Sequence, residues 1–184
     1  MKSPIRADLK ELEALAIKGD VTAQYNLART YYQYDNNKAA FHWYAKAARQ
    51  GNADAIFRVA GFLKTPSCRF EGYLKAAQGG SAFTQWFLGN IYKDGGELYN
   101  LDIAVNEKES LYWYHKAAEQ GYPPAICSLA YHFKLKGELE KSVEYYDRAY
   151  YKLSDELYEL AEKYLLATGK PAFEKETSSA DKSD

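Results

Sequence analysis

The stretch WYAKAARQG at residues 43–51 returns as WYHKAAEQG at residues 113–121, with seven of its nine letters unchanged. A third and weaker copy, GYLKAAQGG, occupies residues 72–80. Repetition of this kind is typical of a chain built from small similar units that stack on one another. The first question is therefore how far each unit extends.

Four units emerge when the copies are aligned on the lysine of KAA. Gly51, Gly80 and Gly121 then share a column, and Gly19 joins them from upstream. Four more columns follow: Ala23, Ala55, Thr84 and Ala125; Leu27, Val59, Leu88 and Leu129; Ala28, Ala60, Gly89 and Ala130; and Tyr31, Leu63, Tyr92 and Phe133. Their spacing places all four columns on one face of a helix. The column of small residues allows a neighbouring helix to approach closely.

Each unit is predicted to be a pair of helices. The first helices are expected at about residues 20–33, 52–64, 81–93 and 122–136, and the second helices at about 37–49, 67–78, 106–119 and 139–152. The recurring glycine follows each second helix, where a left-handed residue ends the helix and glycine adopts that conformation cheaply. A leading helix over 5–18 and a terminal helix over 154–167 are expected to cap the array.

These elements predict one all-α domain over residues 1–169, an α-solenoid of about four stacked helix–turn–helix repeats. The repeats are expected at about 20–51, 52–80, 81–121 and 122–152. A single helix pair of this size cannot bury its apolar face, whereas stacked pairs share a continuous core. The polar residues 170–184 are predicted to form a disordered tail.

Composition argues against several classes of function. The 24 basic residues are balanced by 25 acidic ones, which leaves a net charge of −1 and no attraction to nucleic acid or to an anionic membrane. No apolar run is long enough to span a bilayer, and the N-terminus lacks the apolar core of a signal peptide. Only Cys68 and Cys127 are present, as is typical of a reducing compartment. We therefore expect a cytoplasmic protein.

The sequence contains no arrangement of residues that indicates catalysis. His42, His115 and His132 occupy different columns, and no two of them have the i, i+4 spacing of a helical metal site. The glycine pairs are not followed by the lysine and hydroxyl residue of a phosphate-binding loop, and there is no nucleophile elbow. We expect no enzymatic activity, no metal and no cofactor.

The repeat motifs resemble a known family. YNLA at residues 25–28, the double WY-KAA-QG, and FLGNIYKDGG at 87–96 followed by Asp102 are similar to the Sel-one-like repeat, a relative of the tetratricopeptide repeat. The resemblance covers about residues 14–152. The second unit departs from it by lacking the tryptophan, the third contains an insertion near 97–110, and the fourth lacks the closing glycine.

The resemblance implies protein binding on the concave face, which the first helices line in tetratricopeptide-like stacks. The positions expected to face this groove give the candidate partner-binding residues Tyr25, Arg29, Tyr32, Phe57, Lys64, Phe83, Trp86, Asn90, Lys93, Tyr131 and Lys134. Aromatic residues offer contact area and lysines select an acidic partner. Phe83 and Trp86 are the strongest candidates. The alternative is that the aromatic stripe packs one repeat against the next.

Members of the family act as adaptors and scaffolds, and bacterial members include immunity proteins that neutralise secreted toxins. The resemblance therefore predicts a non-catalytic module that binds another protein, most concretely a bacterial immunity protein. A signalling or regulatory adaptor is the alternative, and an enzyme subunit is a more distant one. Fold alone does not choose among these functions.

Overall fold

The computed structural model describes residues 4–151, with side chains from residue 9 onward. The described chain is all-α, as predicted. Its elements are α1 (Pro4–Ile17), α2 (Val21–Gln33), α3 (Asn37–Arg49), α4 (Ala53–Gly61), α5 (Pro66–Gln78), α6 (Ala82–Asp94), the 3-10 turn η1 (Glu97–Tyr99), α7 (Glu107–Glu119), α8 (Pro123–Leu135) and a helix over residues 139–151. The predicted terminal helix at 154–167 and the tail at 170–184 lie outside the described residues.

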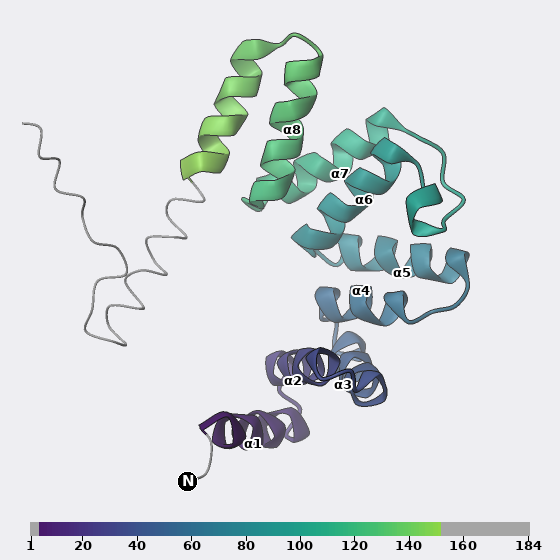
Figure 1. The fold of residues 1–184 in the computed structure, drawn as a ribbon, viewed down its shortest axis with the longest axis vertical. Coiled ribbons are helices and arrows are strands. Elements are labelled where there is room, and N and C mark those ends of the chain that lie inside the picture. Colours follow the sequence, from purple (N-terminus) through teal and green to yellow (C-terminus); the bar gives the residue numbers. More distant parts are fainter. Residues whose placement is uncertain (1–3, 152–184) are drawn as a thin grey trace, which may run out of the picture.

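The helices pack in chain order, each against the next. Repeat one consists of α2 and α3, repeat two of α4 and α5, and repeat three of α6 and α7. Repeat four consists of α8 and the helix over 139–151. Figure 1 shows these units stacked from α1 at the bottom to the last helix at the top, in an arc that opens to the left.

Close helix contacts through the small-residue column hold each pair together. Ala28, Ala60 and Ala130 are at most 1% exposed. A Cβ atom placed on Gly89 would lie 2.4 Å from the ring of Tyr114, so only glycine lets α7 lie this close to α6. In repeat two both helices contribute a small residue, and a Cβ on Gly72 would lie 2.4 Å from that of Ala60. This contact explains why repeat two has no tryptophan at that position.

The aromatic residues of the repeated motif pack in the core. Tyr44 and Tyr114 are 1% and 2% exposed, and Trp113 is 7% exposed. Trp43 is half-buried against the α1–α2 cluster. The copies of the motif are therefore packing elements, and they recur because each repeat must bury the same contact.

The boundaries between helices follow the predicted chemistry. Each recurring glycine has a positive φ: 101° at Gly19, 88° at Gly51, 94° at Gly80 and 76° at Gly121. After three of them comes a helix-capping side chain that accepts a hydrogen bond from the third helical N–H, namely Asp20, Asn52 and Ser81. A left-handed glycine followed directly by an N-cap ends one helix and starts the next within a few residues.

One predicted boundary is wrong. The first helix of repeat two was expected to reach residue 64, but α4 ends at Gly61. The ring of Pro66 disfavours helical backbone at the residue before it, and Thr65 is extended with φ −82° and ψ 131°. Gly61 further weakens this helix end. Lys64 consequently lies on the turn after α4.

Leu88→Ala tests the interior of the array. Leu88 is fully buried, so its truncation should lower the free energy of unfolding by about 2–5 kcal/mol, as measured by chemical denaturation. The matched control is Leu98→Ala, since Leu98 is 76% exposed and its truncation should change stability by no more than about 0.5 kcal/mol. Equal losses in the two variants would contradict the placement of this column in the core.

Candidate functional site

A cavity of about 670 Å³ opens between repeats three and four. It brings together three of the predicted groove residues: Asn90 and Lys93 from α6 and Tyr131 from α8. The remaining lining comes from α7, α8, the loop before α7 and the last helix, and comprises Val105, Glu107, Ser110, Leu111, Tyr114, Cys127, Ser128, His132, Leu135 and Tyr146. The cavity is thus formed by segments far apart in the sequence.

Polar groups of the lining are tied together by hydrogen bonds. The Tyr114 hydroxyl and Asn90 Oδ1 are 2.7 Å apart, and Ser110 Oγ donates to the carbonyl of Gly89 over 2.8 Å. Burial raises the pKa of Tyr114 to about 12, so its hydroxyl remains a protonated donor at neutral pH. Fixed positions for these groups suit a preformed binding site.

The rim of the cavity combines an ion-pair bridge with exposed apolar side chains. Glu107 at the start of α7 lies 2.8 Å from Nζ of Lys136 and 3.8 Å from Nδ1 of His132. The hydrogen bond from Lys136 lowers the pKa of Glu107. Tyr131 and Leu135 are 49% and 68% exposed. A partner could therefore meet apolar surface beside fixed charges.

The predicted aromatic stripe packs between repeats. The ring of Phe57 lies 5.0 Å from those of Tyr73 and Phe83, measured between centroids, so it links repeats two and three. Trp86 lies 6.1 Å from the ring of Tyr122 and donates from Nε1 to Ser128 Oγ over 3.2 Å. Phe83 nevertheless remains 37% exposed. These side chains support the stack and leave part of their surface accessible.

The predicted residues of repeat one lie apart from the cavity. Tyr25 packs on Tyr44 with ring centroids 5.6 Å apart, and Tyr32 packs on Phe62 at 6.3 Å. Tyr32 is 48% exposed and Arg29 is exposed. They form a separate part of the surface, and Tyr32 there contacts Phe62 at the end of α4.

The three predicted lysines are exposed, but the structure does not gather them at one site. Lys93 lines the cavity and pairs with Asp94 at 3.2 Å. Lys64 and Lys134 line none of it and form no ion pair with any residue in the described part of the chain. Only Lys93 therefore belongs to the cavity.

Several cavity residues were not predicted from the sequence. Tyr114 packs in the core and also lines the cavity. Ser110 and Ser128 are small polar residues at the meeting of two repeats, and His132 lies on the rim. The small size of these serines, at positions where helices meet, was the feature of the sequence that could have indicated a cavity. The alignment of columns does not show between which repeats the helices lie far enough apart for a cavity to form.

Residues 9–151 contain no cluster of three histidine, cysteine or acidic side chains able to hold a metal ion. Cys68 is exposed on α5 and Cys127 is half-buried in the cavity lining, and both are free thiols. None of the described helices is long and apolar enough to cross a membrane.

No protein-family model matches the chain, and neither does any curated protein sequence. Solved structures do match. A protective antigen of uropathogenic Escherichia coli strains, which displays an SLR fold, is 28% identical with a TM-score of 0.64, over 78% of this chain and 33% of that one. A Sel1 repeat protein from Oxalobacter formigenes is 25% identical with a TM-score of 0.65, over 77% of this chain and 44% of that one. This chain has the Sel1-like repeat fold.

An immunity protein from Pseudomonas aeruginosa has the same fold, at 22% identity and a TM-score of 0.65, over 83% of this chain and 59% of that one. The chain spans between a third and three-fifths of the length of these three structures. The Sel1-like repeat fold is a scaffold for protein interaction and is generally non-catalytic. The predicted resemblance is confirmed at the level of fold.

Gly89→Ala tests the contact that positions Tyr114. The added methyl group would overlap the tyrosine ring, so the variant should lose about 1–3 kcal/mol of unfolding free energy. Gly61→Ala is the matched control, because a Cβ there meets nothing within 4 Å and alanine favours helix by up to about 1 kcal/mol. Thermal or denaturant unfolding of both variants checks the prediction, which fails if Gly89→Ala is as stable as the control.

Proposed function

We propose that the chain is a non-catalytic module that binds another protein through the inner face of its solenoid. The observation that carries this proposal is the cavity between repeats three and four, where Asn90, Lys93 and Tyr131 meet. It is concave, lined by residues from separate helices, and bordered by half-exposed aromatic surface. Such a surface suits an anchoring side chain of a partner.

The chemistry of the lining supports a protein partner. Tyrosine offers large contact area with few rotatable bonds, and the rim adds polar groups that orient a partner. Phe83, exposed outside the cavity, extends the aromatic surface toward repeat two. An extended segment of a partner would contact both regions, with its apolar anchor in the cavity.

The most concrete form of this proposal is a bacterial immunity protein that works in the cytoplasm. Its support is the similarity of fold to the Pseudomonas aeruginosa immunity protein, over most of this chain. An immunity protein needs only to bind and cover a working surface of its toxin. A preformed groove on a rigid stack meets that need without any catalytic group.

The test is co-production with the product of a neighbouring gene, chosen because that product arrests growth when it is produced alone. The intact chain should restore growth and co-purify with the toxin. Tyr131→Ala should weaken the complex about tenfold by calorimetry, because it removes the cavity-wall aromatic. Tyr112→Ala is the matched control, since Tyr112 is 50% exposed, compared with 49% for Tyr131, and lies outside the cavity lining.

Equal binding by both variants would contradict the proposed site. Co-purification with a signalling protein, without any rescue of growth, would replace the immunity proposal by the adaptor function. Binding by the two variants therefore tests the proposed surface, and the rescue of growth tests the immunity function.

A further inference from the structure

One position of the second helix is aromatic in three of the repeats but is a glycine in repeat two. In the alignment on the lysine of the repeated motif, Trp43, Trp113 and Tyr145 share a column, and Gly72 stands in it for repeat two. Repeat two therefore lacks an aromatic ring at a position where each of the other repeats has one.

The three aromatic side chains of this column fill space between neighbouring helices. Trp113 is 7% exposed and lies in one core cluster with Leu88. Trp43 packs against the cluster formed by α1 and α2. Tyr145 stacks on Phe133, with ring centroids 5.4 Å apart. An aromatic ring at this position is therefore part of the packing in each of these repeats.

A pocket of about 410 Å³ opens beside Gly72, where the ring is missing. This Gly72 pocket is lined by residues of α3, α4 and α5, and the small side chains of Ala45, Ala48 and Ala60 contribute to its walls. A side chain at position 72 could not fill it, because even a Cβ atom there would lie 2.4 Å from that of Ala60. Its volume is within the range of pockets that bind ligands, about 300–1,000 Å³.

The walls of the Gly72 pocket correspond to the surroundings of Trp113 in the next repeat. The lining residues whose counterparts lie in the core cluster of Trp113 are Phe41, Ala45, Ala48, Val59 and Leu63, which align with Phe70, Leu74, Ala77, Leu88 and Tyr92. Two of the five pairs are identical, and in the other three the residue of the Gly72 pocket is the smaller one. The pocket is therefore a wider form of a space that holds an indole ring elsewhere in the same chain.

The mouth of the Gly72 pocket is apolar and partly fixed in position. Phe41 and Leu63 line the pocket and are 41% and 37% exposed, so apolar surface continues out to the solvent. The ring of Phe41 lies edge-on to that of Phe62, with centroids 5.5 Å apart. An entering apolar group would cover these exposed side chains as well as the interior of the pocket.

Two basic side chains border the Gly72 pocket. Arg49 of α3 and Lys75 of α5 belong to its lining and are exposed. Neither forms an ion pair with any residue in the described part of the chain, although Glu71 lies one turn before Lys75 on α5. The lining formed by the described residues includes no acidic side chain. The rim of the pocket is therefore positively charged, and acidic groups complement it.

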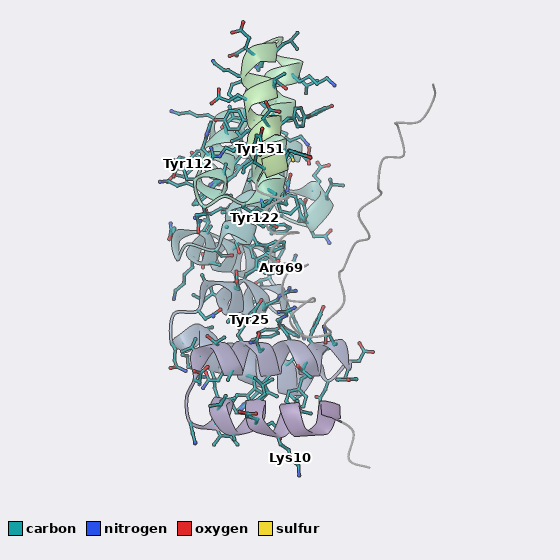
Figure 2. All side chains as sticks on the ribbon, turned by 90° about the vertical axis from the view of Figure 1, so that its left-hand side faces the viewer. Lys10, Tyr25, Arg69, Tyr112, Tyr122 and Tyr151 are labelled. Atoms are coloured by element: carbon teal, nitrogen blue, oxygen red, sulfur yellow. The ribbon has the colours of Figure 1, made fainter. Side chains whose placement is uncertain are left out.

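The Gly72 pocket is separate from the cavity between repeats three and four. The two share no lining residue, and the groove candidates of repeat two, Phe57 and Lys64, line neither of them. Figure 2 shows Tyr25 of repeat one, Arg69 of repeat two and Tyr122 at the start of repeat four at successive levels of the stack. The Gly72 pocket, formed where repeats one and two meet, therefore lies at a different level from the cavity.

We propose that the Gly72 pocket binds a segment of a second partner protein, which places an aromatic side chain in the pocket and acidic residues on either side of it. The ring would occupy the space that corresponds to the one filled by Trp113 in repeat three. The acidic neighbours would lie beside Arg49 and Lys75. Aromatic side chains bury a large area and are enriched among the residues that dominate binding energy at interfaces. This surface is additional to the function proposed above and does not depend on it.

The test is a titration of the intact chain with acetyl-Glu-Trp-Glu-amide, followed by the NMR signals of the Val59 methyl groups. These signals should shift, because Val59 lines the pocket. Ala45→Leu introduces the larger residue found at Leu74 and should weaken binding about tenfold by filling the pocket. Ala82→Leu is the matched control, since Ala82 is half-buried and lines neither the pocket nor the cavity. Circular dichroism checks that both variants fold.

The contribution of the rim is tested with a neutral peptide and a second pair of variants. Acetyl-Gln-Trp-Gln-amide should bind more weakly than the glutamate peptide, and Arg49→Gln should weaken binding of the glutamate peptide about threefold, as is typical of an exposed charge pair. Arg29→Gln is the control for charge, because Arg29 is exposed and lies outside the lining of the pocket. It should leave the affinity unchanged.

Several results would overturn the proposal. Failure of both tryptophan peptides to bind would do so, as would equal weakening by Ala45→Leu and Ala82→Leu, or equal binding of acetyl-Glu-Ala-Glu-amide. Indole-3-acetate that shifts the Val59 signals while the peptides fail would show that the pocket takes a small aromatic molecule instead. Self-association of the intact chain that Ala45→Leu abolishes would show that a second copy fills it. Because the titration uses neither the cavity nor its partner, failure of the co-production test leaves this result unaffected.

Discussion

A close contact between the two helices of a pair, made through at least one small residue, determines the geometry of these repeats. In repeat three Tyr114 covers Gly89 so closely that a methyl group would not fit between them. In repeat two the contact is between Ala60 and Gly72. Because each helix pair is held at this close distance, the stack is rigid enough to keep residues of different repeats in fixed positions. The cavity lies where two such pairs meet.

Much of the fold could be predicted from the sequence, because its determinants are local. A glycine at positive φ followed by a capping side chain ends and starts helices wherever it occurs, and the buried columns repeat with helical spacing. The end of α4 was predicted at residue 64 because the columns do not show how far before a proline, here Pro66, a helix ends. The turn that Pro66 imposes extends back to residue 62, since the residue before a proline avoids helical backbone.

The site was less accessible to sequence reasoning, for a physical reason. Columns show which face a residue is on, and Asn90, Lys93 and Tyr131 were selected in this way. They do not show how far two repeats separate, which determines whether a cavity forms. They also do not show which polar groups already have partners. Asn90 and Arg29 share a column, yet Asn90 is bonded to a tyrosine hydroxyl whereas Arg29 forms no such bond.

The central claim is that a partner protein binds the inner face of the array, at positions where the repeats differ in sequence. The accessibility of the two native cysteines tests this claim. Cys127 lines the cavity and Cys68 is exposed on α5, outside the cavity lining. The most direct measurement is the rate of alkylation of each thiol, by mass spectrometry, with and without bound partner. Slower alkylation of Cys127 with an unchanged rate at Cys68 is the predicted result. Protection of Cys68 with no change at Cys127 would contradict the account.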